Sequence, residues 1–202
     1  MISEIELRRK YDLVARESEG VLERLLQDLQ DFLSGIKYID TPSGRIKSKE
    51  SFVAKVLRDP TKYDPPFVRI EDFIGLRVPV YFRDTAEDLF HKIKEEYAAN
   101  VEDSHKQYGS GYEGFHLIQS IPSSFLPHRR NIGEFPQVFE MQIRTLYVHA
   151  WAQPEHLFRY KNAVAKEEIP EHIMRKIDDL AEMSREADNT LLYLRQWYES
   201  IS

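Results

Sequence analysis

Polar and apolar side chains alternate along residues 138–145, VFEMQIRT, and this alternation predicts a strand. Successive side chains of a strand point to opposite faces, so Glu140, Gln142 and Arg144 share one face and the apolar residues share the other. An acid, an amide and a guanidinium in a row suit the wall of a pocket for a polar, charged ligand. A strand face exposed to solvent explains the alternation equally well.

Polar residues also gather on the helix predicted over residues 146–162, which Pro154 interrupts. Spacings of four, three and four place four of them on one helix face: His149, Gln153, His156 and Tyr160. Lys161 lies one residue beyond. Because the polar strand face runs into this helix face, the pattern favours a pocket wall.

Basic residues cluster where a loop is predicted to meet a helix capped by Ser48. Arg45 and Lys47 come before the helix. Lys55 lies within it, and Ser51 adds a hydroxyl group. A helix N-terminus with local cations binds anions, so this junction could surround a triphosphate. A solvated basic face is the alternative, and the glycine pattern of a Walker loop is absent.

Asp72 opens a second predicted strand, DFIGLRVPVYF over residues 72–82, and Arg77 lies on the polar face of this strand. Gly75 within the strand permits the close approach of another group. If the two strands are neighbours, Asp72 and Glu140 supply two carboxylates. Magnesium binds one or two carboxylates together with phosphate oxygens. A turn residue at the strand end is the other interpretation of Asp72.

Three glycines surround Tyr112 in the stretch YGSGYEGFH over residues 108–116. A tyrosine that projects from a flexible loop can stack on a nucleobase. A simple hairpin turn explains the glycines without any ligand.

A small set of elements must hold these residues in place. Apolar periodicity predicts one long helix and three strands: a helix over residues 2–36, and strands over residues 72–82, 115–121 and 138–145. Pro79 favours an edge strand or a bulge. Pro, Ser and Gly indicate a loop at 40–48, and polar residues indicate another at 100–113.

Pro170 opens a long helix at the C-terminal end of the sequence. Residues on this helix repeat at alternating spacings of four and three and form a stripe: Ile173, Ile177, Leu180, Ser184, Ala187, Leu191, Leu194 and Tyr198. The stripe can pack on its own domain, which is the simpler expectation, or on a second copy of the chain.

The composition excludes several classes of function. The chain has 202 residues, which fits one compact domain with helical extensions, and a net charge of −6. A negative chain has no overall attraction to nucleic acid or anionic membranes, so phosphate binding needs a local basic cluster. The absence of cysteine excludes disulfides and cysteine zinc sites. With no signal peptide and no apolar run of membrane-spanning length, we expect a cytoplasmic protein.

Four strings together resemble the synthetase domain of RelA/SpoT enzymes, in its short single-domain form: GRIKSKESFVAK, IEDFIGLRV, SGYEGFHL and FEMQIRTLYVHAWAQPEHLFRYK. The last is highly specific, because E-x-Q-I-R-T is followed in order by H-A-W-A, E-H and Y-K. The resemblance implies an α+β fold with a mixed, nucleotidyltransferase-like sheet flanked by helices. It implies an N-terminal helix over 1–36, a catalytic core over 40–162 and a helical tail over 170–200.

The resemblance also implies a reaction. In this family the 3′-hydroxyl of GDP or GTP attacks the β-phosphate of ATP, AMP leaves, and the alarmone (p)ppGpp forms. Asp72 and Glu140 would hold Mg²⁺, and Glu140 would help to deprotonate the hydroxyl. Residues implied to bind ATP are Arg45, Lys47, Ser51, Lys55 and Arg77. Residues implied to bind the acceptor are Tyr112, which would stack on its base, and His116, Gln142, Arg144, His156 and Lys161.

The loop around Tyr112 departs from the family pattern. The family reads G-Y-R-S-x-H there, whereas this chain keeps Tyr112 and His116 but has Glu113 and Gly114 in place of the Arg-Ser pair. Some toxic members have a similar loop. They use adenosine nucleotides, or they place the diphosphate on the 3′-CCA end of tRNA and are countered by an antitoxin. The candidate basic patch for tRNA is His-Arg-Arg at 128–130.

Three functions of different classes follow from these observations. An alarmone synthetase comes first, and a toxin that modifies tRNA or adenosine nucleotides is the alternative. An inactive nucleotide-binding regulator is the third, and the presence of Asp72 and Glu140 argues against it. The C-terminal stripe permits a homo-oligomer in each case.

Overall fold

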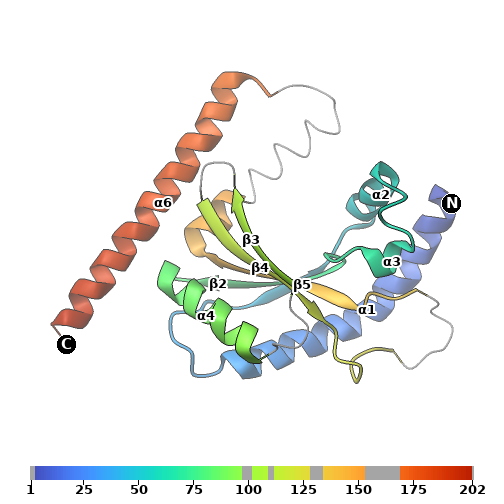
Figure 1. Cartoon of the computed structure of the whole chain (residues 1–202), viewed down its shortest axis with the longest axis horizontal. Helices are drawn as coiled ribbons and strands as arrows, with labels where there is room; N and C mark the ends of the chain where they lie inside the picture. Colours follow the sequence, from blue (N-terminus) through green and yellow to red (C-terminus); the bar gives the residue numbers. More distant parts are fainter. Residues whose placement is uncertain (1–2, 97–101, 109–111, 128–133, 153–168, 202) are drawn as a thin grey trace.

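A mixed β-sheet of five strands forms the centre of the computed structural model (Figure 1). The structure describes residues 3–96, 102–108, 112–127, 134–152 and 169–201, with the backbone alone over 102–108 and 112–113. The strands are β1 (Ser43–Ile46), β2 (Ile74–Val80), β3 (Glu102–Tyr108), β4 (Tyr112–Ser120) and β5 (Val138–Thr145). The helices are α1 (Glu4–Leu33), α2 (Lys49–Arg58), α3 (Pro66–Arg69), α4 (Arg83–Glu96) and α6 (Glu171–Ser200), and residues 146–152 are also helical.

The strands lie in the order β1-β2-β5-β4-β3. β2 and β5 are parallel, and every other neighbouring pair is antiparallel. β5 therefore occupies the middle of the sheet, although it comes last of the five strands along the chain. The predicted α+β fold is confirmed: the sheet is mixed, one long helix precedes it in the sequence, and another follows it.

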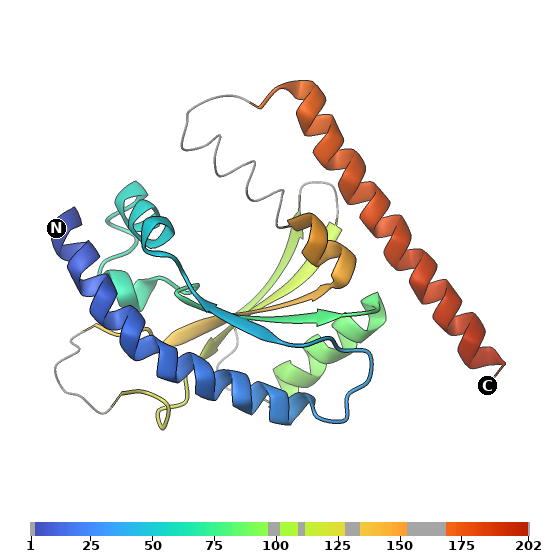
Figure 2. The ribbon, with the colours of Figure 1, turned by 180° about the vertical axis from the view of Figure 1, so that it is seen from behind.

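The two faces of the sheet differ in chemistry. Leu76, Met141 and Leu117 form a row across β2, β5 and β4, and all three are buried. α1 and α4 cover this apolar face (Figures 1 and 2). Phe90 of α4 stacks on Phe115 of β4, with 4.8 Å between the ring centroids. Side chains that alternate with this row point to the opposite face, which is polar.

The first helix follows directly from its sequence. Ser3 is the N-cap, and its hydroxyl oxygen accepts a hydrogen bond from the backbone N–H of Glu6 at 3.3 Å. Acidic residues in the first turn suit the positive end of the helix dipole. The buried side chains recur every three or four residues: Leu7, Tyr11, Val14, Ser18, Val21, Leu25, Leu29 and Leu33. The long helix predicted over 2–36 is thus confirmed, with the bounds Glu4–Leu33.

The loop predicted at 40–48 is wrong, because β1 occupies residues 43–46. β1 is an edge strand whose residues are at best half-buried, so it lacks the apolar alternation that would reveal a strand. α1 packs closely against Gly44 of β1. A Cβ atom at Gly44 would lie 2.5 Å from Cδ1 of Leu22 on α1.

The loop predicted at 100–113 is wrong as well. Residues 102–108 form β3, which pairs antiparallel with β4 as the other edge of the sheet. The sequence of β3, EDSHKQY, contains no apolar period, which explains the error. Tyr108 pairs with Tyr112, so β3 and β4 form a hairpin, and stacking of Tyr112 on a nucleobase stays a prediction.

Pro79 does not mark an edge strand, so that prediction is also wrong. β2 lies between β1 and β5. Pro79 is tolerated because the β1 ladder ends opposite Arg77, two residues earlier. The carbonyl of Pro79 accepts a hydrogen bond from the backbone N–H of Asp40 at 2.9 Å. A strand can therefore be internal and still carry a proline where its neighbour has ended.

The last helix packs on the chain through a narrower face than its sequence suggests. Ile177, Ala181, Ser184 and Asp188 are buried. Leu180, Leu194 and Tyr198 of the predicted stripe are exposed. Packing on its own chain is thus confirmed for part of the stripe, and self-association stays a prediction. Among the described residues no helix, including the two of 30 residues, is apolar enough to cross a membrane.

Two anchors join α6 to the end of β5 and to the helix at 146–152. The indole N–H of Trp151 donates to the carbonyl of Ile177 at 3.1 Å. The hydroxyl of Thr145 donates to the buried carboxylate of Asp188 at 2.6 Å and accepts from the backbone N–H of Val148 at 3.2 Å. Thr145 is therefore the N-cap of the helix at 146–152, and α6 fixes the orientation of that cap.

Gly44→Ala is predicted to destabilise the fold, because the new methyl group would press on Leu22 and on Leu76 Cδ2, 3.0 Å away. We expect a loss of about 1–3 kcal/mol in the free energy of unfolding, measured by urea denaturation. The matched control is Gly20→Ala on the exposed side of α1, where a new Cβ atom would meet nothing within 4 Å among the described residues apart from the helix's own backbone. That change should stabilise by about 0.5–1 kcal/mol. Equal effects at both positions would contradict close packing of α1 on β1.

Candidate active site

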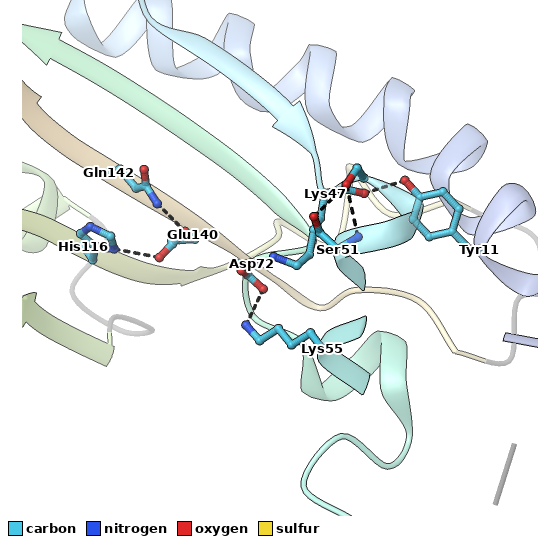
Figure 3. A network of polar contacts seen from close by, with 9 residues as sticks. Tyr11, Lys47, Ser51, Lys55, Asp72, His116, Glu140 and Gln142 are labelled. Atoms are coloured by element: carbon cyan, nitrogen blue, oxygen red, sulfur yellow. Dashed lines mark hydrogen bonds and ion pairs between the residues drawn. The ribbon is translucent and has the colours of Figure 1, made fainter. Parts of the chain in front are cut away.

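A buried hydrogen-bond network lies on the polar face of the sheet (Figure 3). One carboxylate oxygen of Glu140 accepts from Nδ1 of His116 at 2.8 Å, and the other accepts from Nε2 of Gln142 at 2.7 Å. A guanidinium nitrogen of Arg144 lies 3.0 Å from Nε2 of His116. All four of these residues are buried, with exposed fractions of 9 % or less. The polar strand face is thus buried, and the solvent-exposed alternative is wrong.

The partners of His116 determine where its proton lies. A guanidinium group can only donate, so Nε2 of His116 accepts from Arg144. Nδ1 then carries the hydrogen and donates to Glu140. The neutral ring with its hydrogen on Nδ1 satisfies both contacts, and it holds the Glu140 carboxylate in a fixed orientation.

A second network surrounds Asp72, just before β2 (Figure 3). The ammonium groups of Lys47 and Lys55 each lie 2.8 Å from a different carboxylate oxygen of Asp72. Burial alone would raise the pKa of Asp72, but the two ammonium groups outweigh it and lower the pKa to about 2. Asp72 is therefore fully ionised at neutral pH.

Two elements deliver these lysines to Asp72. The backbone N–H of Lys47 donates to the carbonyl of Phe73 at 2.8 Å and extends the contact between β1 and β2 by one residue. Ser48 caps α2, as predicted: its hydroxyl oxygen accepts from the backbone N–H of Ser51 at 3.3 Å. α2 then carries Lys55 back over Asp72. Lys47 and Lys55 are thus organised around a carboxylate, whereas Arg45 at the same junction is exposed.

Strand pairing brings the two networks to the same end of the sheet. Gly75 pairs with Glu140, and Asp72 lies only three residues before Gly75. Arg45 of β1 pairs with Gly75 from the other side. Its Cγ would lie 3.9 Å from a Cβ atom at Gly75. Within the described ranges, no group of three or more His, Asp or Glu side chains gathers as a metal site. Magnesium binding therefore stays a prediction for the pair Asp72 and Glu140.

His149 belongs to the polar helix face predicted as a pocket wall, but the family resemblance assigns it no role. It lies in the first turns of the helix at 146–152. Burial lowers the pKa of His149, and the positive charges of Arg77 and Arg144 lower it further. The ring therefore lies near both guanidinium groups and is neutral at neutral pH. The spacing of His149 from His156 indicates which face of the helix carries His149. It does not indicate that Arg77 and Arg144 lie near the ring.

The structure brings part of the predicted residue set together. It joins Lys47 and Lys55 to Asp72, and it joins three further residues to Glu140: His116, Gln142 and Arg144. Tyr112 begins β4, and its side chain is not among those described. His156, Lys161 and residues 128–130 lie outside the described residues.

With this geometry established, sequence comparison places the chain in a family. The sequence pattern described as "Region found in RelA / SpoT proteins" matches residues 44–165, which is more than half of the chain. The chain belongs to the RelA/SpoT family. The matched RelA/SpoT region contains both networks, from Lys47 to Arg144.

RelA/SpoT relatives extend the likeness beyond the matched region. The chain is 28% identical over 181 residues to GTP pyrophosphokinase YjbM of Bacillus subtilis (strain 168), covering 85% of this chain and 78% of that protein. The crystal structure of small alarmone synthetase 1 from Bacillus subtilis superposes with a TM-score of 0.74 at 22% identity, covering 95% of this chain and 99% of the other. The same protein bound to its product pppGpp gives a TM-score of 0.63 at 22% identity, covering 93% of each chain. These structures share the fold.

Asp72→Asn is predicted to remove a pH-dependent contribution to stability. The folded pKa of Asp72 is about 2, below its ordinary value of 3.8, so the carboxylate stabilises the fold above pH 4 and loses this effect as the pH falls to 2. At pH 7 we expect a loss of about 2 kcal/mol in urea unfolding.

The control for this experiment is Asp178→Asn, at an exposed position of α6. It should leave the unfolding curve unchanged at every pH. The difference between Asp72→Asn and the parent protein should disappear near pH 2. A difference that persists there would show that the variant acts through packing and not through charge.

Proposed function

We propose that this protein is an ATP-dependent pyrophosphokinase that transfers the β,γ-diphosphate of ATP to the 3′-hydroxyl of GDP or GTP, forming (p)ppGpp and AMP. One observation carries the proposal: a pair of lysines suited to phosphates lies beside a buried, oriented carboxylate on the neighbouring strand. Similar proteins support the choice of substrate. YjbM is a GTP pyrophosphokinase, and small alarmone synthetase 1 binds its product pppGpp.

The lysine pair is the proposed donor subsite. In the free protein Asp72 pairs with both Lys47 and Lys55, which keeps the two ammonium groups close together. A polyphosphate chain carries several negative charges and would draw these groups away from the single carboxylate. Arg45 and Ser51 lie at the same junction and would add further donors.

The residues present fit a magnesium ion bound together with ATP. A pKa of about 2 keeps Asp72 ionised. Asp72 would be released from its lysines as they turn to the phosphates. Asp72 and Glu140 would hold the ion, since magnesium takes one or two carboxylates plus phosphate oxygens. When bound, the ion would neutralise charge on the diphosphate that is transferred.

Glu140 is the proposed general base. The 3′-hydroxyl gives its proton to Glu140 as the 3′-oxygen bonds to the β-phosphorus of ATP. The bond from that phosphorus to the oxygen bridging the α- and β-phosphates breaks, and AMP leaves with the oxygen. Each carboxylate oxygen can accept more than one hydrogen bond, so the bonds from His116 and Gln142 are compatible with transfer of a proton to Glu140. Tyr112, Arg144, His156 and Lys161 stay predictions for binding the acceptor.

The experiment that tests the proposal is a transfer assay with γ-labelled ATP and Mg²⁺, in which GDP, GTP, ATP and tRNA are offered separately. Label in guanosine tetra- or pentaphosphate is the expected result. Label on tRNA or on an adenosine nucleotide would replace the guanosine acceptor and favour the toxic alternative. Absence of transfer to every acceptor would overturn the enzymatic proposal in favour of a nucleotide-binding regulator.

Glu140→Gln is predicted to lower kcat by about 10²- to 10⁴-fold, because the amide keeps the shape of the side chain but cannot accept the proton. The rate of label transfer under saturating substrates measures this effect. The melting temperature of the variant should stay close to that of the parent, which separates lost chemistry from lost folding. A variant with unchanged kcat would show that Glu140 is not the base.

Lys55→Met is predicted to raise the KM for ATP by about tenfold or more, the loss expected for one hydrogen bond between charged groups. The matched control is Lys49→Met on the same helix. Lys49 pairs with Asp12 of α1, away from Asp72, so its removal should leave the KM for ATP unchanged. A similar rise in the KM for ATP in both variants would indicate a general effect of positive charge. It would contradict the assignment of a specific phosphate subsite.

A further inference from the structure

The N-terminal helix reaches the donor subsite through one buried side chain. Tyr11 of α1 is 8 % exposed, and its hydroxyl donates a hydrogen bond of 2.6 Å to the backbone carbonyl of Lys47 (Figure 3). The two residues are 36 positions apart in the sequence. β1 ends at Ile46, so the carbonyl of Lys47 lies beyond the strand, and Tyr11 supplies its donor.

The peptide groups on either side of the Lys47 Cα are held from two directions. Its N–H donates to the carbonyl of Phe73 at 2.8 Å, and its carbonyl accepts from Tyr11 at 2.6 Å. Phe73 directly follows Asp72, so the first bond sets the distance between the chain segments of Lys47 and Asp72. The second bond fixes the rotation of the peptide group that follows Lys47. Together they restrict the backbone from which the lysine side chain extends toward the carboxylate.

The ring of Tyr11 touches the other supports of the same cluster. It packs against Phe52 of α2 with 5.6 Å between ring centroids, and edge-on against Phe73 at 5.7 Å. Phe52 lies three residues before Lys55 on α2. One side chain therefore contacts the backbone of Lys47 and the aromatic neighbours of Asp72 and Lys55. Burial raises the pKa of Tyr11, and the charges of Glu50 and Asp12 raise it further, so the hydroxyl keeps its proton for donation at neutral pH.

We propose that Tyr11 is a positioning residue for the donor subsite: its hydroxyl fixes the peptide group of Lys47 and thereby aims the lysine ammonium group at the phosphates of ATP. The helical arm then contributes to ATP binding without touching the nucleotide. This inference rests on the proposed function for the identity of the ligand. It assigns α1 a role in the site in addition to covering the apolar face of the sheet.

Tyr11→Phe tests the proposal in the full chain, because it removes the hydroxyl and keeps the ring. ATP binding is measured by calorimetry in the absence of acceptor, and KM and kcat are measured in the transfer assay. We expect affinity for ATP to fall about fivefold, the effect of one hydrogen bond, with the KM for the acceptor unchanged. A purely structural role for the hydroxyl would lower the melting temperature and leave ATP affinity unchanged.

Tyr63→Phe is the matched control. Tyr63 is also buried, and its ring lies 5.6 Å from the ammonium group of Lys55, but its hydroxyl makes no hydrogen bond among the described residues. This variant should bind ATP like the parent. If Tyr63→Phe lowered the affinity for ATP as much as Tyr11→Phe, the proposal would be overturned.

Combining Tyr11→Phe with Lys47→Met tests whether Tyr11 affects ATP binding through Lys47. If Tyr11 acts through Lys47, then Tyr11→Phe should have little further effect on ATP affinity in a Lys47→Met protein. An undiminished effect in that background would overturn the proposal. Failure of the parent protein to bind ATP at all would instead overturn the proposed function, whereas normal ATP binding by both parent and Tyr11→Phe would overturn the positioning role alone.

Discussion

The parallel pairing of β2 with β5 is the constraint on which the site depends. It sets Gly75 beside Glu140 and so brings the Asp72 network and the Glu140 network to one end of the sheet. A shift of this register by one residue would turn every side chain of β5 to the other face. Met141 and Ile143 would then face the polar side, and Glu140 and Gln142 would enter the apolar core. The same pairing that buries the core therefore orients the site.

Each network solves the problem of burying charge in a different way. Asp72 has two cations, which is more positive charge than the carboxylate needs, so the cluster is left with an attraction for a polyanion. Glu140 has neutral donors from His116 and Gln142, with the guanidinium of Arg144 one step away. A chain with a net charge of −6 can hold nucleotides only through such local arrangements.

The sequence predicts the parts of this fold whose burial is periodic. α1 and β5 were found because their apolar residues recur at helix and strand spacing, and the start of α2 because Ser48 is a strong cap. β1 and β3 were missed because both are sheet edges without an apolar period. The bonds of Tyr11 to Lys47 and of Asp188 to Thr145 join residues 36 and 43 positions apart, and local patterns carry no signal for such contacts.

The order of the strands has a consequence for how the protein forms during synthesis. β1 with β2, and β3 with β4, can pair while the rest of the chain is still being made, but β5 must insert between the two pairs. Until residue 145 has left the ribosome, β2 and β4 each present an open edge, and open edges attract other strands. The lysine cluster around Asp72 belongs to the first pair, whereas Glu140 arrives with the last strand. The proposed phosphate subsite would thus form before the strand that carries the proposed base.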